Sequence, residues 1–329
     1  MATPSLAMIP SGYKATKLYS VLPNTAVGDF DVSRPSGTGG FNATRVNKSG
    51  LIEEVAANVP RLDYTDGGCP VLLTEPQSRN DYLNSQAMVT QSVTTTADTY
   101  TVSFYGTGTI TFSGTYTGSL VGTGANDLVQ LTFTATAGSL VSTVSGTVDE
   151  AQCEKLSYVT SRIRTLGSAV TRNADVVNNA GDVNTFNSSE GVLYAEIAAL
   201  ADDSTLRYIT ISDGTVDNRI IFRYSNAPNT FVVEIKVGGV TTAILSHVFD
   251  ITSFAKIALK WKENDFALWI DGIEEVAVLS GLSYNANTLN QLHFTNFNAS
   301  NQAMYAKTKD LRVYKTALSD AELIELTTL

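Results

Sequence analysis

The chain has 329 residues with 22 Lys plus Arg against 32 Asp plus Glu, which gives a formal charge of −10 with the histidines neutral. This balance, together with the run from Asp81 to Glu154 that contains no Lys or Arg, argues against nucleic acid and anionic membranes as partners. With 43% hydrophobic and 16% charged residues and no apolar run of 18 residues, we expect a folded globular protein that does not span a bilayer.

Charge and composition divide the chain into three regions. Residues 1–80 hold seven basic and seven acidic residues, residues 81–154 hold none and six, and residues 155–329 hold fifteen and nineteen. We predict an extended N-terminal segment at 1–80, a small threonine-rich β-sandwich at 81–154 and a larger β-sandwich at 155–329. The first ten residues lack the basic and apolar parts of a cleaved signal peptide, so we expect synthesis in the cytoplasm without secretion.

The N-terminal 80 residues are proline-rich and show few long alternations of apolar and polar residues. A hairpin is predicted around Asn47–Gly50, and the rest should be extended and irregular. Because this segment has too little core to stand alone, it should be ordered by packing on the neighbouring domain or on another chain. Cys69 and Cys153 lie outside any metal-ligand or disulfide spacing, and we interpret both as small buried residues.

The middle region contains 17 threonines between Thr90 and Thr147, and threonine fits pleated strands. Tyr100, Val102 and Phe104 alternate with hydroxylated neighbours, which predicts strands with one packed and one hydroxylated face. Glycines recur every few residues as turn signals. The region is therefore predicted to be a small antiparallel sandwich.

The last region repeats this pattern with longer strands and ends in a helix. Gly238-Gly239 and Asp271-Gly272 are two-residue hairpin signals between alternating segments. Ser319 and Glu322 form a capping box, and Leu318 before the cap can pack on Leu323. The fold class is all-β, with two antiparallel sandwiches and a short C-terminal helix.

Catalytic motifs are not found. His247 and His293 lie in alternating strands and are interpreted as structural. The stretch Trp269–Glu274 partly resembles the acidic strand of laminarinase-like enzymes, but Trp269 stands at the nucleophile position and Asp271-Gly272 is explained as a turn. We therefore predict that the chain is not an enzyme, with a polysaccharide depolymerase using two facing acids as the third alternative.

Two kinds of ligand site remain open. Calcium would need several loop oxygens, and no cofactor is expected unless this ion is held by acids near strand ends. The candidate calcium ligands are Asp202, Asp203, Asp213 and Asp217, with Asn218 nearby. Sugar binding would use exposed aromatic rings flanked by polar side chains, and turn or core roles are the alternatives for each residue. The candidate sugar-stacking residues are Tyr105, Tyr116, Tyr208, Tyr224 and Tyr284.

Several stretches of the sequence resemble those of a known protein family. The N-terminal region contains Met8–Lys14, Lys17–Pro23, Ala43–Asn47, Gly50–Val55, Pro60–Tyr64 and Cys69–Gln77, and later stretches are Gly167–Asp175, Asp310–Lys315 and Ala317–Leu323. These resemble structural proteins of tailed bacteriophages, described as tail-fibre or LamG-type lectin proteins. The chain departs from them at Ser78-Arg79-Asn80, where the family usually has Arg-Thr-Asn.

The resemblance implies a virion-surface protein of the fibre or decoration type. Residues 1–80 would attach to other virion proteins, followed by two jelly-roll-like modules, a carbohydrate-binding-like module and a LamG or concanavalin A-like domain. The first hypothesis is a homo-oligomer that adheres weakly and multivalently to host-surface glycans. The second is a purely structural protein that cements or caps the particle, and the resemblance itself implies no ligand residue.

Overall fold

The computed structural model describes residues 2–297 and 299–328, and almost all regular structure in them is β. The chain divides into two compact units. Unit 1 comprises the residues up to Ser33, Asn58–Thr74 and the residues from Asp175 onward, and unit 2 comprises Arg34–Ala57 and Glu75–Ala174. The all-β prediction with a short C-terminal helix is confirmed.

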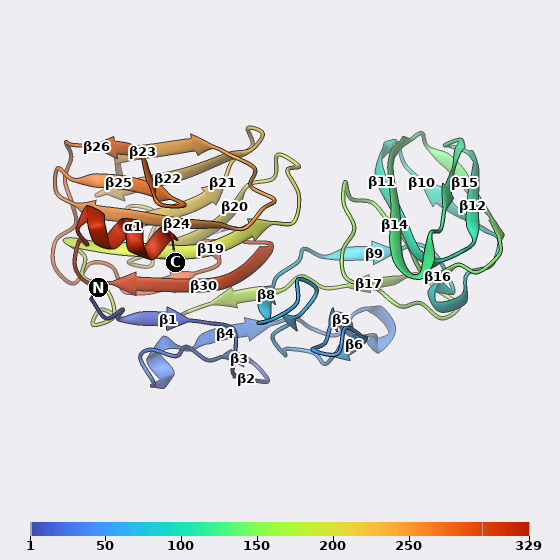
Figure 1. The fold of residues 1–329 in the computed structure, drawn as a ribbon, viewed down its shortest axis with the longest axis horizontal. Coiled ribbons are helices and arrows are strands. Elements are labelled where there is room, and N and C mark those ends of the chain that lie inside the picture. Colours follow the sequence, from blue (N-terminus) through green and yellow to red (C-terminus); the bar gives the residue numbers. More distant parts are fainter. Residues whose placement is uncertain (1, 298, 329) are drawn as a thin grey trace. The chain divides into compact units, whose positions relative to one another are not determined.

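Unit 1 contains most of the strands and the helix (Figure 1). Its elements are β1 (Leu6–Met8), β2 (Tyr13–Lys14), β3 (Lys17–Leu18), the 3₁₀ turn η1 (Ala26–Gly28), β4 (Phe30–Ser33), β7 (Leu62–Asp63), β8 (Val71–Leu73), β18 (Val176–Asn178), β19 (Glu190–Ala199), β20 (Arg207–Ser212), β21 (Arg219–Tyr224), β22 (Thr230–Val237), β23 (Val240–Val248), β24 (Ala255–Lys262), β25 (Phe266–Ile270), β26 (Ile273–Val278), β27 (Gln291–His293), β28 (Thr295–Asn296), β29 (Ala299–Ala303), β30 (Ala306–Tyr314) and α1 (Asp320–Thr328).

Two large sheets form the sandwich of unit 1. One has the order β26-β25-β24-β19-β30-β8-β7 with β1 also paired to β30, and the other has the order β23-β22-β21-β20-β29-β28 with β27 also paired to β20. The pairs are antiparallel except for a short parallel contact between β20 and β29. Between the sheets lies one core, which includes Ile209, Phe222, Phe231, Leu259 and Trp261. This arrangement agrees with the predicted larger sandwich.

The N-terminal 80 residues do not form a separate segment. β1 pairs with β30 through Leu6 opposite Val313, and β8 pairs with β30 through Leu73 opposite Lys307. Residues Arg34–Ala57 and those from Glu75 onward belong to unit 2 instead. The structure thus divides the chain differently from the ranges 1–80, 81–154 and 155–329. The physical reason is that β1, β4, β8 and β9 obtain hydrogen bonds from strands built by residues after 169, whereas β5 and β6 pair with each other.

Local turn and cap predictions agree with the structure. Gly238 and Gly239 have φ of 58° and 82° between β22 and β23, and Asp271 and Gly272 have φ of 47° and 88° between β25 and β26. These are the positive angles that two-residue hairpins of this type require. A hairpin also joins β5 (Ala43–Val46) to β6 (Ile52–Val55) in unit 2.

Helix α1 begins after the predicted capping box. Ser319 Oγ donates to Glu322 Oε2 at 2.9 Å, and the Ser319 backbone N–H donates to the same oxygen at 3.0 Å. Leu318 and Leu323 are buried in one cluster with Trp269 from β25. The helix therefore covers the outer face of the sheet that contains β24 and β25, as Figure 1 shows.

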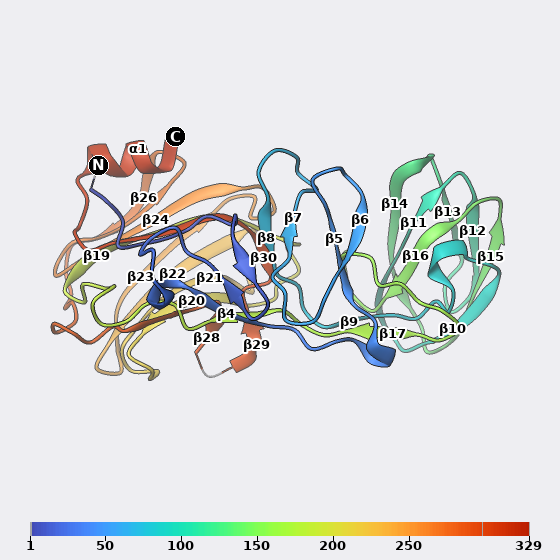
Figure 2. The ribbon, with the colours of Figure 1, turned by 90° about the horizontal axis from the view of Figure 1, so that it is seen from below.

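Unit 2 is the small sandwich. Its remaining elements are η2 (Thr38–Gly40), β9 (Ser78–Asn80), η3 (Ser85–Ala87), β10 (Gln91–Thr95), β11 (Asp98–Gly106), β12 (Thr109–Gly114), β13 (Gly118–Val121), β14 (Gly124–Ala135), β15 (Gly138–Ser145), β16 (Asp149–Glu154) and β17 (Val170–Arg172). The sheet β10-β15-β12-β13 faces the sheet β14-β11-β16, and Figure 2 shows β11 and β14 on one side with β12 and β15 on the other.

The predicted alternation along β11 is confirmed on its inner face and modified on its outer face. Tyr100, Val102 and Phe104 are buried in the core of unit 2. Thr101 and Ser103 are buried too, because the segment after β16 covers them. Thr101 Oγ1 donates to the carbonyl of Leu156 at 2.8 Å. The hydroxylated face of this strand is therefore partly used within the unit.

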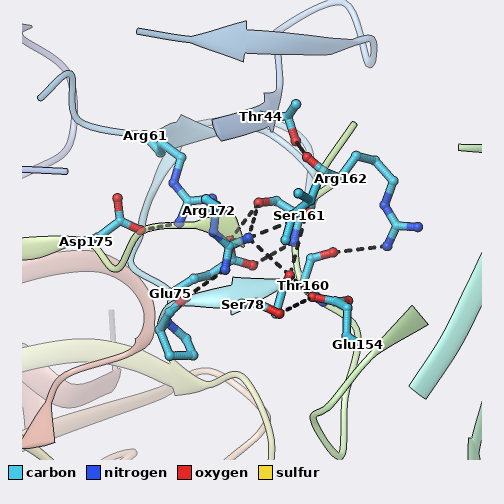
Figure 3. Close-up of polar contacts among 12 residues, drawn as sticks. Thr44, Arg61, Glu75, Ser78, Glu154, Thr160, Ser161, Arg162, Arg172 and Asp175 are labelled. Carbon is cyan, nitrogen blue, oxygen red and sulfur yellow. Dashed lines mark hydrogen bonds and ion pairs between the residues drawn. The ribbon is translucent and has the colours of Figure 1, made fainter. Parts of the chain in front are cut away.

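A buried polar network joins the segments that flank the sandwich of unit 2 (Figure 3). Arg172 forms an ion pair with Glu75 at 2.8 Å, and their side chains are 2% and 4% exposed. Glu75 also accepts hydrogen bonds from the backbone N–H and hydroxyl of Ser161 at 2.8 and 2.7 Å. The charges are thus matched inside the unit, as buried charges must be.

Glu154 is the second carboxylate of this network. Ser78 Oγ donates to Glu154 Oε1 at 2.7 Å, and the Thr160 backbone N–H donates to Oε2 at 3.1 Å. Burial nevertheless raises the pKa of Glu154, and the nearby Arg172 and Arg162 act in the opposite direction. Glu154 is fully enclosed, so we assign the network a structural role.

The two cysteines differ from each other. Cys153 is buried in unit 2 as predicted, whereas Cys69 is exposed, and both are free thiols. Cys69 follows Gly67 and Gly68, which adopt positive φ in the turn between β7 and β8, so the interpretation of Cys69 as buried is wrong.

Among the described residues, no helix has the length and apolar character needed to cross a membrane.

Candidate functional site

The two tyrosines predicted as sugar ligands in unit 2 pack on their own neighbours. Tyr116 stacks on Phe133 with ring centroids 4.1 Å apart. The guanidinium of Arg162 lies 5.8 Å from the centroid of the Tyr105 ring. Both rings are half-buried, and they lie in different sheets or turns of the sandwich. The structure does not bring them together into one site.

The three tyrosines predicted in unit 1 are buried. Tyr224 has no exposed surface and points into the core between the sheets. Tyr284 is 4% exposed and lines a groove of about 440 Å³ beside Lys262, which is paired with Glu190 at 3.1 Å. Tyr208 is 7% exposed. The expectation that these rings are freely exposed for stacking is therefore corrected, because alternation places Tyr224 on the inner face and neighbouring side chains cover the other two.

The four candidate calcium ligands do not converge. Asp203 forms an ion pair with Arg207 at 2.7 Å, and Asp202 accepts the backbone N–H of Asn229 at 3.0 Å. Asp213 caps the next turn by accepting the hydroxyl of Thr215 at 2.6 Å and the amide of Asn218 at 2.8 Å.

Asp217 is exposed on that same turn, and its backbone carbonyl accepts the N–H of Gly239 at 2.9 Å. The two pairs lie at opposite ends of β20, since Asp202 and Asp203 precede it whereas Asp213 and Asp217 follow it. In the part of the chain that the structure describes, no group of three or more His, Cys, Asp or Glu side chains is placed to hold a metal.

Polar side chains gather instead on the outer face of the sheet that contains β20 and β21. Strand register places Tyr208 opposite Arg223, Ser212 opposite Arg219, and Thr210 opposite both Ile221 and His293. Residues directly opposite on antiparallel strands point to the same face. The core residues Ile209, Ile211, Ile220, Phe222 and Tyr224 take the other face. We call the group Tyr208, Thr210, Arg219, Arg223 and His293 the arginine face.

The charge of the arginine face is positive. Arg219 donates from Nη1 to the amide oxygen of Asn296 at 2.6 Å. Among the described residues, neither Arg219 nor Arg223 has a carboxylate within ion-pair distance. The one acid on the adjacent strand, Glu234, accepts from Thr241 at 3.1 Å and lies 3.9 Å from Lys236. Two half-buried guanidinium groups thus lack an anionic partner in a chain of formal charge −10.

Buried polar atoms without partners belong to residues of the same face. Thr210 Oγ1, His293 Nε2 and Arg219 Nε have no hydrogen-bond partner among the described residues. Thr210 is fully buried and His293 is 6% exposed. Buried polar groups are nearly always hydrogen-bonded, so several such atoms on one face indicate a place for ordered water or a polar ligand.

Two pKa shifts describe the same environment. Burial raises the pKa of Tyr208, and the nearby Arg223 and Arg219 oppose this effect. Burial lowers the pKa of His293 below its usual value of 6.5. His293 is therefore a neutral imidazole at pH 7, in which one ring nitrogen can donate a hydrogen bond and the other can accept one.

The lowered pKa of His293 predicts a pH dependence of stability. Between the folded and unfolded pKa values, the unfolded chain binds the proton and the folded chain does not, so stability is lost as pH falls below about 6.5. We expect the free energy of unfolding of the wild type, relative to His293→Gln, to fall between pH 7 and pH 5 by at most about 1.4 kcal/mol per pH unit. Urea unfolding at each pH measures this, and parallel pH profiles for the two proteins would contradict it.

Acids lie together in two concavities, as the depolymerase alternative requires. Glu190 and Glu263 line the groove of about 440 Å³, and Glu196, Asp310 and Glu325 line a concavity of about 260 Å³ beside α1. Arg312 donates to both oxygens of Asp310 at 3.1 and 2.5 Å, Lys309 lies 3.1 Å from Glu196, and Lys262 lies 3.1 Å from Glu190. In each concavity an acid is thus held by a cation, which is typical of a structural ion-pair network.

The sequence contains a pattern that predicts part of the arginine face, although the search for exposed tyrosines did not include it. In β21, Arg219 and Arg223 alternate with Ile220, Phe222 and Tyr224, and period-two alternation places the arginines on one face and Tyr224 in the core. The neighbouring strand is not predictable in this way, because the contact of Thr210 with His293 joins residues 83 positions apart in a register that no local pattern determines.

No protein-family model matches the chain, and no curated protein sequence matches it. Among solved structures, similarity is found to the CBM40 module of the Ruminococcus gnavus IT-sialidase, with 16% identity, a TM-score of 0.37 and coverage of 43% of this chain and 84% of that chain. The same module bound to alpha2,3 sialyllactose aligns with a TM-score of 0.36 and 16% identity over 42% of this chain and 83% of that chain. A leech intramolecular trans-sialidase aligns with a TM-score of 0.36 and 17% identity over 43% of this chain and 24% of that chain. These similarities are too distant to indicate a shared ligand.

Proposed function

We propose that the protein is a non-enzymatic adhesion protein whose arginine face binds a carboxylate-bearing glycan. The observation that carries this proposal is the pair of guanidinium groups of Arg219 and Arg223, which have no carboxylate partner in the described part of the chain and share a face with the unpartnered buried atoms of Thr210 and His293. A guanidinium fork matches a carboxylate in shape and charge. The enclosed Thr210 hydroxyl and His293 imidazole can hold ordered water beside the bound glycan.

The wider setting of the proposal is the surface of a tailed-phage particle. The phage-like phrases of the N-terminal region support this setting, as does the all-β architecture with LamG-like ending phrases. Several copies on one particle would make weak binding at a single arginine face sufficient, because tethered sites raise the effective concentration of the ligand. Homo-oligomerisation and contacts with other virion proteins belong to the same proposal.

Binding to matched acidic and neutral sugars tests the proposal. We expect sialyllactose or oligo-uronate to bind the wild type and lactose to bind much more weakly. Arg223→Ala should weaken binding of the acidic sugar by about tenfold to a hundredfold, since a charge-assisted hydrogen bond contributes roughly 1.5–3 kcal/mol. Isothermal titration calorimetry or biolayer interferometry measures the change.

Lys262→Ala is the matched control for this test. Lys262 lies on β24 in the other sheet of unit 1, its side chain is 53% exposed, and it is paired with Glu190 at 3.1 Å. Its removal should leave acidic-sugar binding unchanged. Equal affinity for acidic and neutral sugars, or equal loss in Arg223→Ala and Lys262→Ala, would refute the proposal.

A structural role in cementing the particle is the second candidate function. It is favoured by Val240, Ile244 and Val248, which are 67%, 58% and 66% exposed on the edge strand β23. Exposed apolar side chains on an unpaired edge are suited to contact with another chain. Cryo-electron microscopy of the particle distinguishes the two roles, because cementing would cover this edge whereas adhesion requires the arginine face to be open.

A further inference from the structure

A further concavity lies in unit 2, and its chemistry differs from that of the arginine face. It has a volume of about 610 Å³, within the range of small-molecule sites, and it is open to solvent along one side of the small sandwich. We call it the polar groove and define it by Arg79, Asp81, Thr94, Tyr100 and Lys155. None of these residues was predicted as a ligand.

One wall of the polar groove is an edge strand. β10 pairs with β15 on one side only, so its other edge faces the groove. Ser92 and Thr94 are exposed on this strand, and their hydroxyls make no hydrogen bond to any described residue. The wall therefore offers hydroxyl groups and free backbone donors and acceptors to a bound molecule.

The floor of the polar groove is apolar. Val93 and Tyr100, which are 8% and 3% exposed, come from the core of unit 2, and Leu156 adds to the lining. The backbone N–H of Thr96 donates to the hydroxyl of Tyr100 at 3.1 Å, which fixes the ring. A rigid apolar floor between hydroxylated walls suits a sugar ring, which has C–H faces and polar edges.

The charges around the polar groove cancel within the unit. Arg79 is paired with Asp81 at 2.9 Å, and Lys155 is paired with Asp98 at 2.9 Å. Among the described residues, the guanidinium groups of the arginine face have no carboxylate partner, whereas both cations that line the polar groove are already paired with an acid. Charge complementarity therefore favours an uncharged ligand here.

We propose that the polar groove is a second glycan site that binds an uncharged oligosaccharide. The ligand would lie along β10 with its hydroxyls on Ser92 and Thr94, and the half-buried Leu156 would contact its apolar face, with Val93 and Tyr100 beneath. This inference does not depend on the arginine face, since all the residues that line the groove belong to unit 2. A chain with both sites would recognise a glycan surface through two chemically different groups.

Filling the groove tests this proposal in the full chain. Maltohexaose, cellohexaose, isomaltohexaose and mannohexaose serve as probes, and saturation-transfer NMR with calorimetry measures binding. Thr94→Trp should reduce affinity for the bound probe by at least about tenfold, because the new ring occupies the space of the ligand. Ser92→Trp should reduce the affinity to the same extent. A loss in both variants would show that the effect does not come from misfolding of one of them.

Thr111→Trp is the control for these variants. Thr111 is also an exposed threonine, on β12 of the same sheet, but it does not line the groove. The Thr111→Trp variant should bind the neutral probe as the wild type does. Arg223→Ala should also bind this probe normally, which distinguishes this proposal from the proposal on the arginine face. Failure of all four probes to bind at about 10 mM, or equal binding by Thr94→Trp and Thr111→Trp, would overturn the proposal.

Discussion

Replacing Arg172 with alanine should destabilise unit 2 by about 3–5 kcal/mol, because removing one partner of a buried ion pair leaves the other charge buried and uncompensated. Arg172 is 2% exposed and contacts Glu75 at 2.8 Å and Thr160 Oγ1 at 3.1 Å. Its loss would leave the buried Glu75 carboxylate without the Arg172 guanidinium, although Ser161 would still donate to it (Figure 3). The expected effect is a large part of the stability of a small sandwich.

Both tryptophans, Trp261 and Trp269, lie in unit 1, so the readout can separate the units. Arg172→Ala should lower the midpoint of the far-UV circular dichroism transition and increase hydrogen exchange across β9, β16 and β17. The tryptophan fluorescence transition should stay close to that of the wild type. An equal shift of the fluorescence transition would show that the network does not stabilise unit 2 alone.

Two further variants test the cause of this destabilisation. The double variant Glu75→Gln with Arg172→Met removes both charges and should recover most of the lost stability, since a neutral pair of similar size avoids the desolvation cost. Arg79→Ala removes an exposed arginine of the same unit and should change stability by less than about 1 kcal/mol. A double variant as unstable as Arg172→Ala would exclude the charge explanation.

Local sequence patterns predicted the parts of the fold that local chemistry determines. The hairpin at Gly238-Gly239 and the capping box of Ser319 with Glu322 follow from backbone angles and hydrogen bonds within a few residues. The pairing of β1 and β8 with β30 has no such signal, because Leu6 and Val313 are separated by almost the whole chain. Residues 1–80 therefore looked like one extended segment although their strands belong to two units.

The candidate site shows the same limit. The alternation of Arg219 and Arg223 with Phe222 predicts which side chains share a face of β21, but it does not predict which strands lie beside β21. Only the sheet order reveals that Tyr208, Thr210 and His293 complete that face. Whether an arginine has an ion-pair partner also depends on the tertiary structure. Asp203 forms an ion pair with Arg207, whereas Arg223 has no acid within ion-pair distance among the described residues.

Replacing Arg61 with alanine should destabilise unit 1 by about 3–5 kcal/mol for the same physical reason as in unit 2. Arg61 and Asp175 form a buried ion pair, with side chains 0% and 3% exposed, which Figure 3 also shows. Arg61 precedes β7, and its carbonyl accepts the backbone N–H of Leu73 at 2.9 Å. The pair thus joins the segment 58–74 to the start of the C-terminal part of unit 1.

The expected result for Arg61→Ala is a lower midpoint of the urea transition followed by tryptophan fluorescence, because Trp261 and Trp269 report on unit 1. Lys307→Ala is the matched control, since Lys307 pairs with Asp66 of the same segment at 2.9 Å but the two side chains are 28% and 36% exposed. This control should lose less than about 1 kcal/mol. If Arg61→Ala leaves the fluorescence transition unchanged, the Arg61–Asp175 ion pair does not stabilise unit 1, and the prediction is wrong.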